Sequence, residues 1–173
     1  VFGVTAMLII PFVKVYTLGI DDADYVQPLF AVLIVAANAA HCLRLPYNIM
    51  ILAAGHYKQT QNNYIVAAVL NIVISILAGK TWGLIGVAIG TFVAMVYQTI
   101  WMAWYDSNNL IAWPLKNVAR QITVDVVSVL ICSLASSVFR MSSVSYLNWV
   151  INAVAVSVIW FLIMAVINLL LYR

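Results

Sequence analysis

Long hydrophobic stretches alternate with short polar connections along the chain, a pattern typical of polytopic helical membrane proteins. A helix needs about 20 mostly apolar residues to cross the hydrocarbon core, and six stretches approach or exceed that length. They cover residues 1–17, 26–54, 64–78, 82–105, 122–139 and 147–171. Ten-residue segments of alternating polarity are absent, so we expect an all-α membrane fold of about six transmembrane helices rather than a barrel.

Composition supports the same class of protein. Hydrophobic residues make up 66% of the 173 residues and charged residues only 8%, whereas soluble domains carry about 25% charged residues. The formal net charge of +3 is too small and too scattered to indicate nucleic-acid binding. Both cysteines, Cys42 and Cys132, lie in apolar runs, which makes a disulfide framework or a metal site improbable.

The connections predict an orientation in the membrane. Basic residues gather on one side, which the positive-inside rule makes cytoplasmic; these are Lys58, Lys116, Arg120 and Arg173. The opposite side receives the acidic loop of Asp21, Asp22 and Asp24, together with the basic residues Lys80 and Arg140. We therefore expect a multi-pass protein of a cell membrane with a cytoplasmic C-terminus. The only long connection, residues 106–121 with Pro114, is predicted to be a cytoplasmic interfacial loop.

The most informative stretch is 26–54, because its polar residues share one face. On an ideal helix, five polar side chains fall within an arc of roughly 120°; they are Gln27, Asn38, His41, Arg44 and Asn48. The rest of that helix surface is aliphatic or aromatic. Polar groups of this kind are not left facing lipid, so we expect the stripe to face other helices or water.

Two interpretations of this stripe compete. It could supply interhelical hydrogen bonds, with Arg44 extending to the cytoplasmic interface, or it could line a hydrated cavity for a polar or anionic substrate. A charge with four polar groups exceeds what packing usually requires, which favours the cavity. Pro46 predicts a kink, either static or acting as a hinge. Lys14 would extend to the outer interface, with an anion contact as the alternative.

Two further stretches carry polar or small residues at helical spacing. Tyr64, Asn71 and Ser75 share a face, and Asn71 is expected to clamp two helices together or, less commonly, to bind a ligand. Gly86 and Gly90 form a GxxxG pattern, which predicts close packing of two helix backbones. No Ser/His/Asp set, carboxylate pair or HExxH motif occurs, so we expect neither an enzyme nor a bound cofactor or metal.

Several short motifs stand in a fixed order along the chain. They are Arg-x-Pro-Tyr at 44–47, Ala-Ala-Gly-His-x-Lys-x-Thr at 53–60, Asn-Ile-x-x-Ser at 71–75 and Gly-Leu-Ile-Gly-Val-Ala-Ile-Gly-Thr at 83–91. Val-Tyr-Thr at 15–17 precedes them, and Tyr-Leu-Asn-Trp at 146–149 follows. In this order and spacing they resemble the second lobe of bacterial polysaccharide flippases, whose superfamily includes the MATE multidrug exporters and the lipid II flippase.

The resemblance implies a fold and an activity. Residues 1–105 would be the last four helices of a MATE-like second lobe, and residues 122–173 two additional C-terminal helices. The family moves oligosaccharide repeat units, carried on a polyprenyl diphosphate, across the cytoplasmic membrane by alternating access for cell-surface polysaccharide synthesis. By position, Arg44 and Lys14 would contact the anionic group. The groups that would bind sugar or line its path are Asn38, His41, Asn48 and Asn71.

The resemblance also implies that a preceding lobe of the same parent chain is missing. The sequence starts inside an apolar run without Met, so we expect a piece of a longer protein that does not transport by itself. Two alternatives stay open. A MATE-like cation exporter would typically carry acidic residues in its spans, where only Asp125 is predicted. A membrane scaffold subunit would instead assemble through the small-residue face of residues 82–105.

Overall fold

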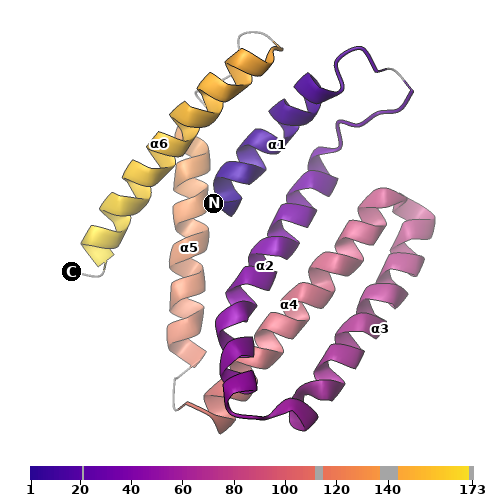
Figure 1. Cartoon of the computed structure of the whole chain (residues 1–173), viewed down its shortest axis with the longest axis vertical. Helices are drawn as coiled ribbons and strands as arrows, with labels where there is room; N and C mark the ends of the chain where they lie inside the picture. Colours follow the sequence, from indigo (N-terminus) through magenta and orange to yellow (C-terminus); the bar gives the residue numbers. More distant parts are fainter. Residues whose placement is uncertain (21, 112–114, 137–143, 172–173) are drawn as a thin grey trace. The chain divides into compact units, whose positions relative to one another are not determined.

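The computed structural model describes residues 1–20, 22–111, 115–136 and 144–171, and all the regular secondary structure in these residues is α-helical. Six helices follow one another along the chain (Figure 1). They are α1 (Phe2–Tyr16), α2 (Pro28–Ala53), α3 (Tyr57–Trp82), α4 (Leu84–Asn109), α5 (Leu115–Ser136) and α6 (Tyr146–Leu171). The predicted all-α fold is confirmed.

Four of these helices are long and apolar enough to span a bilayer, namely α2, α3, α4 and α6. Helix α1 and residues 122–136 of α5 are shorter apolar helices. On α3 the large hydrophobic side chains Ile65, Val69, Ile72 and Ile76 are exposed. An apolar surface of this kind fits a lipid environment and would be unfavourable in water. The chain therefore has the character of a membrane protein.

The structure corrects two predicted boundaries. Helix α3 begins at Tyr57, seven residues before the expected position 64. The prediction of a long loop at 106–121 is wrong, because α4 continues to Asn109 and α5 already begins at Leu115. An apolar stretch ends where polar residues begin, whereas the backbone hydrogen bonds of a helix can continue into a polar helix end. Hydropathy therefore predicts helices that are too short. The predictions for Asp21, Pro114, Arg140 and Arg173, and the predicted helix end at 139, lie outside the described residues.

The contacts divide the chain into two compact units, and the first of them, the hairpin unit, covers Val32–Arg120. Its helices α3 and α4 are joined at Gly83, whose φ of +55° is a conformation that favours glycine. A Cβ atom on Gly86 would overlap the backbone of Ala78, and one on Gly90 would overlap the Ser75 hydroxyl. The two helix backbones thus approach closely through the GxxxG pattern, as predicted.

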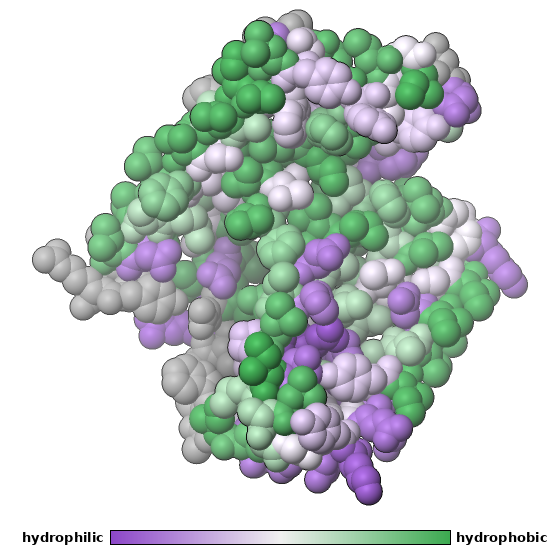
Figure 2. All heavy atoms as spheres, in the orientation of Figure 1, coloured by the Kyte–Doolittle hydropathy of each residue, from purple (hydrophilic) through white to green (hydrophobic). Residues whose placement is uncertain are grey.

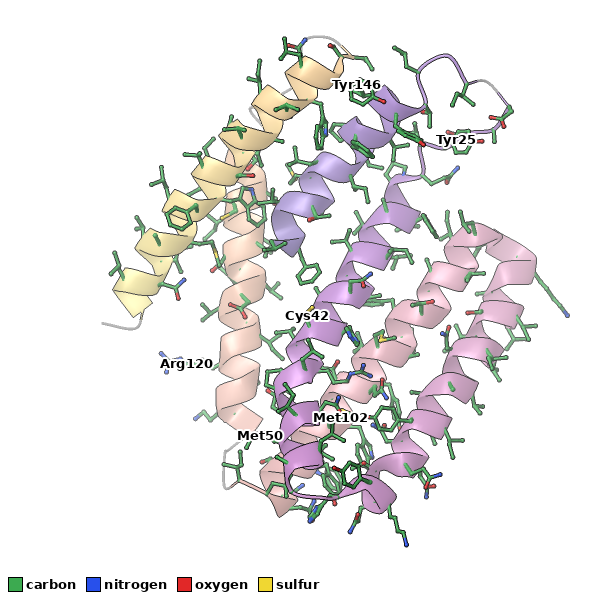
Figure 3. All side chains as sticks on the ribbon, viewed as in Figure 1. Tyr25, Cys42, Met50, Met102, Arg120 and Tyr146 are labelled. Carbon is green, nitrogen blue, oxygen red and sulfur yellow. The ribbon has the colours of Figure 1, made fainter. Side chains whose placement is uncertain are left out.

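Residues 32–53 of α2 complete the hairpin unit. The Thr99 hydroxyl of α4 donates a 2.9 Å hydrogen bond to the carbonyl of Ala40 in α2. Closer to the C-terminal ends of both helices, the buried side chains of Ile51, Met102 and Tyr105 form a hydrophobic core. Figure 3 labels Met102 on α4 and Met50 on α2 in this region. Helix α2 therefore packs on α4 through one polar contact and one apolar cluster.

The second unit, the terminal unit, combines Val1–Ala31 with Gln121–Arg173. Leu8, Cys132, Val156 and Trp160 form its core and join α1, α5 and α6. The Trp160 indole donates a 2.7 Å hydrogen bond to the Ser136 hydroxyl. These contacts satisfy the polar edge of a buried tryptophan while its ring fills the core.

Candidate functional site

A buried cation lies in the middle of the polar stripe of α2. Arg44 is only 8% exposed, although the helix around it is apolar. Its Nη2 atom donates a 2.7 Å hydrogen bond to Nδ1 of His41, one turn earlier on the same helix. Because arginine has only donors, this contact requires an unprotonated Nδ1 on His41. Arginine and histidine thus form a polar pair on the inner side of α2.

A second polar pair links α2 to α3 beside this arginine. The Tyr64 hydroxyl donates a 2.6 Å hydrogen bond to Oδ1 of Asn48. Tyr64 also interacts electrostatically with Arg44. Four side chains from two helices therefore make up one group, which we call the Arg44 cluster: His41, Arg44, Asn48 and Tyr64. On the face seen in Figure 2, hydrophilic residues gather over the lower part of α2, α3 and α4.

The charge of the Arg44 cluster is not balanced by a carboxylate in the described part of the chain. Arg44 forms no ion pair there, and its Nε atom is buried without a hydrogen-bond partner. A buried guanidinium costs free energy unless its donors and its charge are compensated. The arrangement is therefore suited to an anionic group, which would accept hydrogen bonds from the free donor and neutralise the charge.

Polar residues continue from the Arg44 cluster toward the N-terminal end of α3. Asn63 is 2% exposed, and neither its Nδ2 nor its Oδ1 atom has a hydrogen-bond partner. Thr60 is equally buried and donates to the carbonyl of His56 in its own helix turn. The hairpin unit thus buries several polar side chains where α3 begins, a costly arrangement that marks functional sites in membrane proteins.

Three of the six predicted site residues belong to the Arg44 cluster, namely His41, Arg44 and Asn48. Asn38 and Asn71 instead satisfy their side chains within their own helices. Asn38 is exposed and donates a 2.9 Å hydrogen bond to the carbonyl of Ile34. Asn71 accepts a 3.1 Å hydrogen bond from Ser75, and its backbone carbonyl lies against Gly90. Asn71 therefore lies at the α3–α4 packing surface, while its side-chain hydrogen bond stays within α3.

Lys14, the sixth predicted residue, lies on α1 in the terminal unit, and its side chain is exposed. It lies in the last turn of α1, two residues before the final residue Tyr16. Exposure at a helix end is what extension toward the interface requires.

Sequence reasoning missed two buried polar residues. The hydropathy pattern predicts a helix start at 64 and a helix end at 105, and these bounds place both Asn63 and Asp106 in connections. The structure includes both in helices and buries them to 2% and 3% exposure. Residues 59–63 contain no glycine or proline. This lack of a helix breaker is the sequence signal that indicates an earlier start of the helix that contains Asn63.

Comparisons with known proteins add no identification: no protein-family model, curated protein or solved structure matches the chain. Within the described residues, no three histidine, cysteine or acidic side chains come together in a way that could hold a metal ion. The chemistry available at the Arg44 cluster is therefore a cationic donor group beside amide, imidazole and phenol side chains.

Proposed function

We propose that this chain forms the C-terminal part of a transporter that flips polyprenyl-diphosphate-linked oligosaccharide units across the bacterial cytoplasmic membrane. The observation that carries the proposal is the buried Arg44 guanidinium, which has no ion pair among the described residues and one free donor. A diphosphate is the kind of anion that compensates a guanidinium by charge and by hydrogen bonds. The order of the sequence motifs supports the same substrate class.

The neighbours of Arg44 suit the rest of such a substrate. Asn48 and Tyr64 present an amide and a phenol beside the guanidinium, and these groups bind sugar hydroxyls well. We include His41, Asn38 and Asn71 as further candidate sugar contacts and Lys14 as a second cation. Movement of so polar a head group requires alternating access, which in this proposal involves the preceding lobe of the parent chain. The proposed orientation keeps the C-terminus in the cytoplasm.

The test is transport by the complete reading frame that contains this chain, reconstituted in vesicles with radiolabelled lipid-linked oligosaccharide. Arg44→Gln removes the charge and is expected to reduce flipping by at least tenfold. Arg44→Lys keeps the charge but loses the planar fork, so partial activity is expected. The matched control is Arg120→Gln, which removes an exposed arginine. Flipping by Arg44→Gln at the unmodified rate contradicts the proposal.

The two alternatives give different outcomes in the same vesicles. A MATE-like exporter would move cationic dyes without turning over the lipid-linked oligosaccharide. Asp106 lies within helix α4, so the described helices carry a second acidic residue in addition to Asp125 of α5, which keeps that alternative under test. A scaffold would move neither compound. Its supposed assembly face is already used inside this chain, because Gly86 and Gly90 pack on α3.

A further inference from the structure

Asp106 is a buried carboxyl group that belongs neither to the Arg44 cluster nor to the proposed transport chemistry. It lies near the end of α4 and is 3% exposed. Both of its carboxyl oxygen atoms are buried and without a hydrogen-bond partner. It also forms no ion pair with any residue in the described part of the chain. A side chain in this state needs a ligand or a proton to compensate it.

The surroundings of Asp106 are aromatic and apolar. Met102 precedes it by one turn on the same face, and Tyr105 is its neighbour in the chain; both belong to the core with Ile51. The titratable group that faces it from α2 is Tyr47. From the start of α3, His56 shares a 2.9 Å hydrogen bond with the Tyr105 hydroxyl. No cation from these elements reaches the carboxyl group in the described structure.

The size and coordination of the site decide which ligand fits. A phosphate group carries the same sign of charge as a carboxylate, so it cannot compensate the charge of this site. A sodium ion requires several oxygen ligands, as hard cations do, and no hydroxyl or amide group in the described structure is hydrogen-bonded to this carboxyl group. A proton needs only one of the two oxygen atoms and removes the charge that makes burial costly.

We propose that the Asp106 carboxyl group is a proton-binding site, which holds a proton while it is buried beside Tyr47, at the end of α4 where Met102 and Tyr105 pack on Ile51. Release of the proton leaves a carboxylate in an apolar enclosure, so deprotonation favours opening of the contact between α2 and the end of α4. The site does not depend on what the protein transports. Failure of the flippase proposal therefore leaves this inference standing. Failure of the proton-binding proposal likewise leaves the flippase proposal standing.

Infrared spectroscopy of the full chain in lipid nanodiscs tests the proposal directly. A protonated carboxyl group gives a C=O stretching band that is separate from carboxylate bands and shifts in heavy water. We expect this band at neutral pH, its loss as the pH is raised, and its absence in Asp106→Asn. Asp24→Asn, which removes an exposed carboxyl group near α2, is the matched control and should keep the band.

Additional variants and salts separate the remaining outcomes. Asp106→Glu retains a carboxyl group and should keep the band, which guards against loss through misfolding of the asparagine variant. Asp125→Asn should also leave it in place. The proposal is overturned if the unmodified chain lacks the band at neutral pH or if Asp106→Asn retains it in full. It is also overturned if replacing choline chloride by sodium chloride removes the band at constant pH, because the ligand is then sodium.

Discussion

The Tyr64 hydroxyl of α3 donates a 2.6 Å hydrogen bond to the Asn48 side chain of α2, sixteen residues earlier in the chain. This bond joins α2 and α3 next to the buried Arg44. It therefore links a structural contact of the hairpin unit to the residue on which the proposed function depends. Its strength is measurable separately from the charge of Arg44.

Removal of the Tyr64 hydroxyl should loosen the contact between α2 and α3. We expect Tyr64→Phe to lower the free energy of unfolding by about 1 kcal/mol, the usual net value of one hydrogen bond. A double-mutant cycle with Asn48→Ala, measured by denaturant unfolding in micelles, isolates the pair. Tyr57→Phe, an exposed tyrosine two turns earlier on α3, is the control. Additive effects of the Tyr64 and Asn48 variants would contradict the contact.

The glycine contacts between α3 and α4 should tolerate no side chain. Gly86→Ala and Gly90→Ala place a methyl group against the backbone or the Ser75 hydroxyl of α3. We expect each to reduce the free energy of unfolding by about 1–3 kcal/mol, as overpacking does. The control is Gly79→Ala, whose Cβ would meet Val87 at an ordinary 3.7 Å. Equal stability of all three variants would show that the helices do not approach so closely.

The indole of Trp160 should stabilise the terminal unit through both its ring and its N–H group. Ser136→Ala removes the acceptor of its 2.7 Å hydrogen bond and leaves a buried donor unsatisfied, which costs about 1–3 kcal/mol. Ser133→Ala, on the same helix, loses only a bond to a carbonyl of its own helix and serves as the control. Trp160 fluorescence and thermal unfolding report the change. A Ser136→Ala variant as stable as the control would contradict the buried bond.

The buried Arg44 side chain should lower the free energy of unfolding rather than raise it. Replacing a buried, unpaired cation by an apolar side chain of similar volume is commonly neutral or stabilising. We therefore expect Arg44→Met to keep or raise the free energy of unfolding, while transport by the complete protein is lost. Arg120→Met, at an exposed position, should change neither quantity. A marked loss of stability in Arg44→Met would indicate that the guanidinium is a structural residue.

The sequence by itself determined the class of protein and the number of helices. Long apolar stretches must form helices in lipid, because each helix satisfies its own backbone hydrogen bonds. The GxxxG pattern of Gly86 and Gly90 also determined a packing surface, since only the absence of Cβ atoms lets two backbones approach. Composition and periodicity suffice for such features because they depend on local geometry and on the solvent.

The tertiary structure decided which polar residues are enclosed. Asn38 and Arg44 belong to the same stripe on α2, yet Asn38 is exposed and Arg44 is buried, because neighbouring helices cover only part of a stripe. Asn63 and Asp106 fall in polar ends that hydropathy assigns to loops, and packing of α2, α3 and α4 buries them. Burial depends on contacts between residues far apart in the chain, which the local pattern does not contain.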